Sequence, residues 1–153
     1  MSYGGSRFST EGWLLATQIS PMLAVPDPVA AIEFYGLAFG ATVRWQIGDP
    51  AEVAGLSVDG AEFFLAWECP PRTRAPGTFG ATSVRIELFV EDPAEAFERA
   101  VAAGASEGSP VREHTHAIAG PQPGTMRMLQ GSVVDPSGHI WLIGKFVDDA
   151  SHH

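Results

Sequence analysis

The chain has 153 residues, of which 45% are hydrophobic and 18% charged, so it can bury a core large enough for one compact domain. Its formal net charge is −9, with 18 acidic residues against nine lysines and arginines. This balance argues against nucleic acid and anionic membrane surfaces as partners, because binding to both rests on clustered cations. It permits a cationic ligand without indicating one.

The single cysteine, Cys69, cannot form an internal disulfide, which favours a reducing compartment. The chain opens without a basic-then-apolar leader, and no apolar run approaches the roughly 18 residues of a membrane span. We therefore expect a cytoplasmic protein that does not associate with membranes.

The first half of the chain predicts one strand, one helix and three strands. Met1–Gly12 is small and polar and reads as a flexible extension, which Trp13-Leu14-Leu15 would pack against the body or a second subunit. Asp59-Gly60 is a strong hairpin-turn signal between the last two strands. The predicted elements are Gln18–Val25, Asp27–Phe39, Thr42–Ile47, Ala54–Val58 and Glu62–Trp67.

The second half follows a linker that is rich in proline and glycine and has no periodicity, at residues 68–82. We expect this linker to cross between modules rather than to mark a domain boundary. The polar tail at residues 147–153 ends in His152 and His153, whose native origin the sequence does not decide. The elements predicted between them are a strand at Ser83–Val90, a helix from Pro93 to Gly104, a weak strand at Glu107–Glu113, a long loop at His114–Thr125, and strands at Met126–Val134 and His139–Lys145.

The strand-to-helix stretch Ser83–Gly104 has a second copy about 65 positions upstream. In both copies an Asp-Pro pair begins the helix and a Gly-Ala pair ends it, which fits a capping aspartate, a proline in the first turn and a glycine stop. A repeat of this length suits a duplicated supersecondary module. The alternative is two ordinary strand-to-helix turns that both use Asp-Pro; the shared cap, stop and spacing favour duplication.

Two such modules, each opening on Val-x-Asp-Pro, resemble the vicinal oxygen chelate superfamily, which includes glyoxalase, extradiol dioxygenases and bleomycin-resistance proteins. AIEFYGLAFGA at 31–41 resembles its first-helix signature, and VVDPSGHIWLIG at 133–144 resembles the closing hairpin of its glyoxalase-like group. The resemblance implies an α+β fold in which two βαβββ modules form an open half-barrel mixed sheet. Helices would cover the convex face, and the concave face would form a cavity. It also implies a single domain at 13–146, with modules at 18–67 and 83–146, and a homodimer.

Enzymes of this superfamily hold one divalent ion with up to four side chains from the first and last strands of each module. Carried onto this chain, these positions hold no competent ligand for zinc, nickel or iron, and a permanently charged arginine would repel the ion. A register error of one residue would not bring in a histidine. The sequence therefore predicts that the usual metal site is lost and that no cofactor is bound. The four positions are Ser20, Phe64, Arg85 and Leu142.

Residues two apart on a strand share a face, so the neighbours of these positions predict a mostly apolar and aromatic cavity with one guanidinium, two carboxylates and one hydroxyl. Arg85 would hold a ligand carboxylate or oxyanion. Alternatively, Glu87 or Glu62 neutralises Arg85, which then only satisfies buried charge. The predicted ligand-binding residues are Ser20, Met22, Glu62, Phe64, Arg85, Glu87, Phe89 and Leu142.

His114-x-His116 is the other spacing typical of metal sites, since both rings of an extended segment face one side and could bind zinc with a third ligand such as Glu113. The alternative is a histidine pair that is solvent-exposed or lies at a cavity rim.

Three functions fit these patterns. The first is a metal-free protein that binds a small organic molecule, as bleomycin-resistance proteins do. The second is a lyase or isomerase acting on a small carbonyl or oxyanion substrate, with Arg85 and Glu87 as candidate catalytic residues or with a metal at His114 and His116. The third is a structural or regulatory dimer whose cavity is filled.

Overall fold

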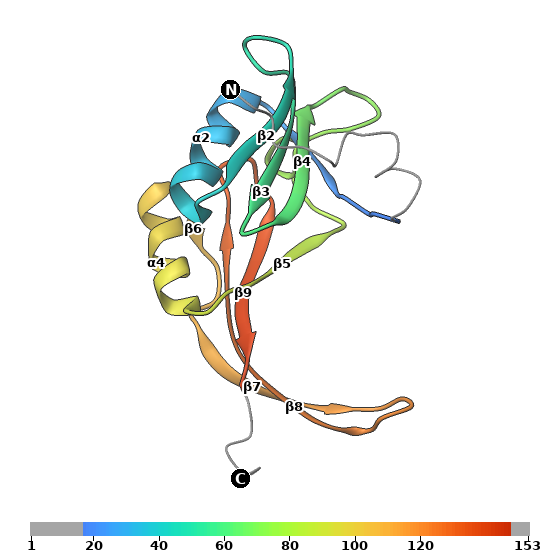
Figure 1. The fold of residues 1–153 in the computed structure, drawn as a ribbon, viewed down its shortest axis with the longest axis vertical. Helices are drawn as coiled ribbons and strands as arrows, with labels where there is room; N and C mark the ends of the chain where they lie inside the picture. The colour runs from blue at the N-terminus through green and yellow to red at the C-terminus, as the bar shows by residue number, and fades with distance from the viewer. Residues whose placement is uncertain (1–16, 148–153) are drawn as a thin grey trace.

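The computed structural model describes residues 17–147, so the predicted N-terminal extension with Trp13–Leu15, and His152 and His153 of the predicted tail, lie outside the described residues. Within that range two sheets form, each from a strand, a helix and further strands in the same order (Figure 1). The helices are α2 (Pro28–Phe39), α3 (Pro76–Phe79) and α4 (Pro93–Ala103). The architecture is mixed α+β with an open sheet arrangement, as the sequence predicts.

The first sheet has the order β1-β4-β3-β2. β1 runs parallel to β4, with Met22 opposite Phe64, and the remaining neighbours are antiparallel. A register shift between Val43 and Trp45 bends β2. The strands are β1 (Met22–Val25), β2 (Thr42–Ile47), β3 (Val53–Val58) and β4 (Ala61–Trp67).

The second sheet has the order β5-β9-β8-β6, with β7 also paired to β8. β5 runs parallel to β9, with Glu87 opposite Leu142, and so repeats the β1–β4 pairing of the first sheet. The strands are β5 (Arg85–Phe89), β6 (Ser106–Glu107), β7 (Arg112–Ile118), β8 (Gly124–Val134) and β9 (Ile140–Phe146).

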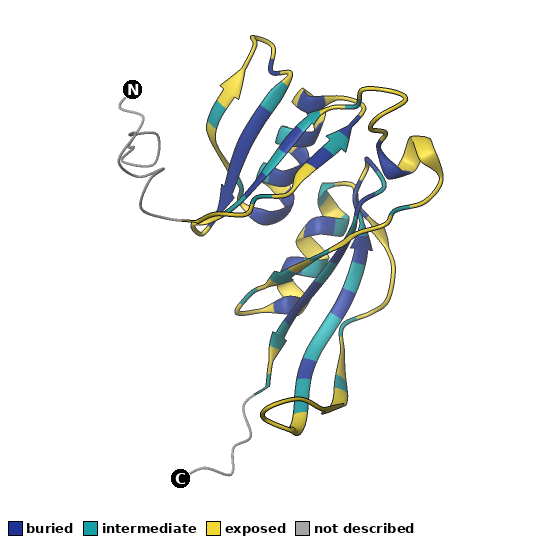
Figure 2. Cartoon of the chain, turned by 90° about the vertical axis from the view of Figure 1, so that its right-hand side faces the viewer, coloured by how far each residue is buried: buried dark blue, intermediate teal, exposed yellow. Residues whose placement is uncertain are grey.

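Helices α2 and α4 lie side by side and cover the same side of the two sheets (Figures 1 and 2). Asp27 and Asp92 cap them by accepting hydrogen bonds from the Ala30 and Glu95 amides. The side chains between helices and sheets form one buried cluster that includes Phe34, Leu65 and Trp141. Alternate strand residues face the other way, and we call that side of each sheet its open face.

Part of the linker between the modules forms a helix. Its short helix α3, which the sequence did not predict, packs against the turn before β9: Gly77 N donates to Ser137 O at 2.9 Å. Gly138 has φ 94°, and a Cβ there would overlap the Gly77 backbone, so the close approach requires glycine. The linker is therefore fixed to the second module at the turn.

The prediction of a long loop at His114–Thr125 is wrong. β7 extends through Ile118 and pairs along its whole length with β8, and the two strands form an arm that projects from the body (Figure 1). Both faces of β7 are largely exposed, so the segment lacks the apolar alternation by which a strand is recognised. No helix within residues 17–147 is long and apolar enough to cross a membrane.

Candidate functional site

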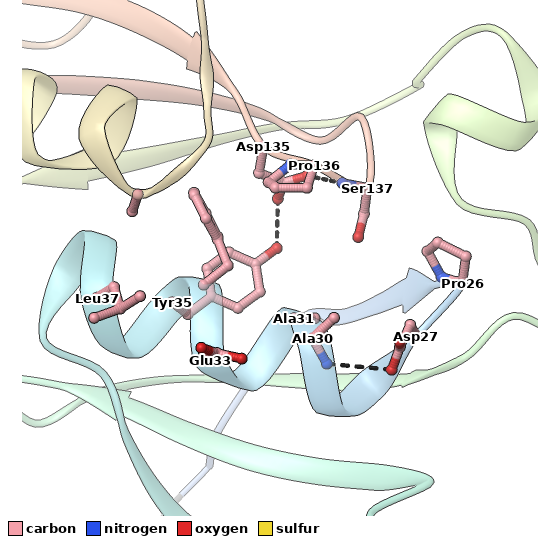
Figure 3. Close-up of a pocket in the computed structure, with 12 residues that line it drawn as sticks. Pro26, Asp27, Ala30, Ala31, Glu33, Tyr35, Leu37, Asp135, Pro136 and Ser137 are labelled. Atoms are coloured by element: carbon pink, nitrogen blue, oxygen red, sulfur yellow. Dashed lines mark hydrogen bonds between the residues drawn. The ribbon is translucent and has the colours of Figure 1, made fainter.

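A buried carboxylate joins the two modules. Asp135, in the turn between β8 and β9, is 4% exposed and accepts a hydrogen bond from the Tyr35 hydroxyl of α2 (Figure 3). The same carboxylate oxygen accepts a second from Trp141 Nε1 at 2.9 Å. The Ser137 and His139 amides each donate to its other oxygen at 2.9 Å. We call this arrangement the Asp135 latch. Four donors around one carboxylate offset the cost of burying its charge.

Tyr35 and His139 extend the latch into the first module. Burial, and then the neighbouring Asp135 carboxylate, raise the pKa of Tyr35 well above its ordinary value of 10.0, so the phenol stays neutral and donates. His139 Nε2 lies 2.8 Å from the Ala24 carbonyl oxygen of β1, so this side chain connects the turn before β9 to the backbone of the first module. The latch therefore fixes how the two open faces lie with respect to each other.

The open face of the second module carries Arg85, Glu87 and Phe89 on consecutive outward positions of β5, all exposed. Glu87 accepts a hydrogen bond from Gln130 Nε2 at 3.1 Å. Within residues 17–147 the Arg85 guanidinium makes neither an ion pair nor a hydrogen bond. In the described part of the chain, Arg85 is thus not neutralised by Glu87, and its five N–H donors face solvent.

Apolar side chains lie beside Arg85 and Glu87 on this face. Leu142 lies opposite Glu87 on β9, and Phe89 stacks on Phe146 with ring centroids 5.1 Å apart. Phe89 is 49% and Phe146 is 54% exposed, so the stacked pair presents a large aromatic surface to solvent. The open face of the second module therefore combines a cation that has no partner among the described residues with an apolar wall.

The open face of the first module is filled by its own side chains. Trp45 lies across Gly55, where a Cβ would overlap its indole ring, and contacts Phe64 with centroids 5.0 Å apart. Met22, opposite Phe64, is 55% exposed. Ser20 precedes β1 and is partly buried, and Glu62 lies beside a polar hollow formed with Arg44 and Thr42.

A cavity of about 470 Å³ lies where the edges of β1 and β5 approach each other. Met22 and Ile86 belong to its apolar wall, and the linker contributes Arg72, Arg74 and Phe79. Like Arg85, the two linker arginines make no side-chain hydrogen bond or ion pair within residues 17–147. The sequence does not reveal that these two arginines line a cavity, because a proline-rich linker shows no periodicity that would place its side chains.

The eight predicted ligand residues thus fall into two groups. Arg85, Glu87, Phe89 and Leu142 share the open face of the second sheet, whereas Met22, Glu62 and Phe64 share that of the first, with Ser20 just before it. Of these, Met22 reaches the cavity between the modules and Glu62 the separate polar hollow. That all eight contact one ligand stays a prediction.

The residues predicted from the resemblance to occupy metal positions do not fit a metal ion. Phe64 and Leu142 stand at equivalent registers, opposite Met22 and Glu87, and offer no donor atom. Residues 17–147 contain no group of three or more His, Cys, Asp or Glu side chains that could hold an ion. Glu113, the suggested third ligand of a zinc site, lies on the other face of β7 from His114 and binds Arg127 at 2.7 Å.

Comparisons with known proteins agree with this architecture. Residues 20–142 match the model of the glyoxalase-like domain family. An uncharacterized protein of Mycobacterium bovis is 30% identical over 140 residues, which cover 87% of this chain and 86% of that protein.

Solved structures show the same fold. TioX from Micromonospora sp. ML1 aligns with a TM-score of 0.63 at 24% identity, covering 86% of this chain and 100% of TioX. A glyoxalase/bleomycin resistance protein/dioxygenase from Alicyclobacillus acidocaldarius aligns with a TM-score of 0.60 at 11% identity, covering 90% of this chain and 96% of that one. At these identities the likeness concerns the fold alone.

Proposed function

The chain belongs to the glyoxalase-like domain family, and on that premise we propose that it is a metal-free binding protein for a small organic molecule that carries an acidic group. The observation that carries the proposal is Arg85, an exposed guanidinium without a partner in the described chain, at a position where the resemblance predicts a metal ligand in enzymes of the superfamily. A guanidinium binds a carboxylate through two parallel charge-assisted hydrogen bonds.

The surroundings of Arg85 favour an apolar or aromatic body for this ligand. The stacked Phe89 and Phe146 lie on the same open face as Arg85. The cavity between the modules, which is lined from β5 by Ile86 rather than Arg85, offers a second apolar surface nearby. A few polar groups set in an apolar lining are typical of small-molecule sites. An aromatic carboxylate is therefore the simplest probe.

The positive charge of residues 69–86 supports an anionic ligand, although the chain has a net charge of −9. Residues 69–86 contain Arg72, Arg74 and Arg85 and no aspartate or glutamate, although the chain as a whole is strongly acidic. Two of these arginines line the cavity and the third begins β5. A local cluster of one sign attracts the opposite charge at short range, where salt screens less.

A second candidate function is a lyase or isomerase reaction on a small carbonyl or oxyanion substrate. The observation favouring it is Glu87, which shares the open face of β5 with Arg85 and is oriented by Gln130 at 3.1 Å. In this case Arg85 holds the oxyanion and Glu87 moves the proton. Turnover that is lost in Glu87→Gln, with ligand binding retained, distinguishes the enzyme from the binding protein.

A homodimer is part of the proposal. Large apolar side chains on the open faces stay in water in the single chain, among them Met22, Ile47 and Phe146 at 54–59% exposed. A second copy that covers them would close the site from the outside. The molar mass in solution, measured by light scattering, tests this. The cytoplasmic location stays a prediction from the sequence.

The proposal is tested by a thermal-shift screen of aromatic carboxylates, each paired with its neutral amide. We expect acids to raise the melting temperature of the parent and of Arg44→Ala, a matched exposed arginine on β2, and to lose most of this effect on Arg85→Ala. Acids that stabilise Arg85→Ala as much as the parent would remove Arg85 from the site. If the neutral amides raise the melting temperature as much as the acids do, the ligand does not need to be an anion.

A further inference from the structure

The arm formed by β7 and β8 brings two histidines and two methionines together on one face. His114 lies directly opposite Met128 and His116 directly opposite Met126 in the antiparallel ladder. Side chains in such positions have Cβ atoms about 4.5–5.5 Å apart and share a face. The sequence separates these residues by the hairpin turn, so the cluster exists only because His114–Ile118 is a strand.

Ring geometry shows that both imidazoles point to this face. Their centroids are 6.3 Å apart and their planes differ by 9°. His114 Nε2 lies 3.2 Å from the Gln130 carbonyl oxygen, and when it donates there, Nδ1 carries the lone pair. A backbone carbonyl that fixes one ring nitrogen in this way is the usual support of a metal-binding histidine.

The two faces of the arm differ in chemistry. Glu113 and Arg127 form their ion pair on the opposite face, at 2.7 Å, so no carboxylate stands among the four side chains. Met128 is 4% exposed, which keeps one thioether away from water beside His114. Arg112 follows on the same face, opposite Gln130, and adds a positive charge nearby.

We propose that His114, His116, Met126 and Met128 form a binding site for a soft monovalent metal ion, Cu(I). Thioethers select Cu(I), and imidazole nitrogen is acceptable to it, whereas calcium, magnesium and manganese prefer carboxylate and carbonyl oxygens, which none of these four side chains offers. Two imidazoles at alternate positions of a strand need only side-chain rotation to meet one ion with ligands from the paired strand. A single positive charge also tolerates Arg112 better than a divalent ion does. The proposal does not rest on the proposed function, whose ligand is held at Arg85 without a metal, although Met128 lies opposite Phe146 on the same sheet face. It involves no redox step.

The test is a competition titration of the full chain with Cu(I) and a chromophoric chelator under argon. Cys69→Ser, His152→Gln and His153→Gln are introduced first, since these residues could bind the ion elsewhere in the chain. We expect one equivalent of Cu(I) to bind, with affinity at least 10-fold lower in Met126→Leu and in His116→Gln. Met22→Leu, an exposed methionine on β1, is the matched control and leaves the affinity unchanged.

Two outcomes of the Cu(I) titration would overturn the site. One is Cu(I) affinity that the Met126 and His116 variants leave unchanged. The other is Zn(II) displacing Cu(I) at equal concentration, because a site selected by thioethers does not prefer zinc. Silver(I), which keeps its oxidation state, provides a second readout: the methyl resonances of Met126 and Met128 shift on addition of one equivalent, while that of Met22 does not. Methionine resonances that all stay in place would also contradict the proposal.

Discussion

The two modules share one topology and differ in what their open faces carry. In the first module Trp45 covers Gly55 and contacts Phe64, so the face is filled by its own side chains. In the second module the equivalent face presents Arg85, a glutamate held by Gln130, and a stacked aromatic pair in solvent. The two modules share a framework, and the side chains proposed to recognise a ligand lie on the open face of the second.

We expect the largest loss of stability from a substitution in the Asp135 latch, which connects the two modules. Asp135→Ala leaves the buried Tyr35 hydroxyl, Trp141 N–H and two amides without their acceptor. We expect a loss of about 4 kcal/mol in the free energy of unfolding, measured by urea denaturation. Asp92→Ala, which removes a helix cap in the second module, is the control and loses about 1 kcal/mol. Equal losses in the two variants would refute the importance of the latch.

The filled face of the first module is tested at Gly55. Gly55→Ala places a Cβ inside the indole of Trp45, and we expect it to destabilise the chain by about 2 kcal/mol. Gly124→Ala on β8, where a Cβ meets no atom within 4 Å, is the matched control and should have little effect. Removing the ring as well, in Gly55→Ala/Trp45→Ala, should abolish the penalty of the alanine. If the penalty persists without the ring, Trp45 does not fill this face.

A substitution at Tyr35 separates the contribution of the latch hydrogen bond to stability from that of ring packing, and its expected effect is smaller. Tyr35→Phe keeps the ring but removes the donor, with an expected loss of about 1.5 kcal/mol at neutral pH. Because the pKa of Tyr35 is raised in the folded chain, its contribution is complete below pH 10 and is lost as the pH rises above 10. Stability of the parent should therefore fall more steeply above pH 10 than that of Tyr35→Phe. Parallel pH profiles would contradict this role of the phenol.

The sequence predicted the elements whose signals are local. The Asp-Pro caps, the glycine stops and the Asp59-Gly60 turn act within a few residues, and they place helices α2 and α4 and the β3–β4 hairpin. β7 was missed because only its pairing with β8 makes it a strand. The resemblance to a known superfamily then supplied the architecture, which the family match confirms.

The candidate site was less accessible to sequence reasoning, because its determinants are long-range. Tyr35 and Asp135 are 100 positions apart, so Asp135 reads as an ordinary turn residue. The sequence left open whether Glu87 neutralises Arg85. In the structure the Glu87 carboxylate instead accepts a hydrogen bond from Gln130, a residue of β8. The arginines of the linker, Arg72 and Arg74, reach the cavity only because α3 is fixed to the turn before β9.

The central claim is that Arg85 recognises the acidic group of a ligand on the open face of the second module. Calorimetric titration of one aromatic carboxylate and its amide, each with the parent and with Arg85→Ala, gives the coupling free energy between the guanidinium and the carboxylate directly. We predict a coupling of about 1.5–3 kcal/mol, typical of a hydrogen bond to a charged group. A coupling near zero, with the acid still bound by both proteins, would contradict the account.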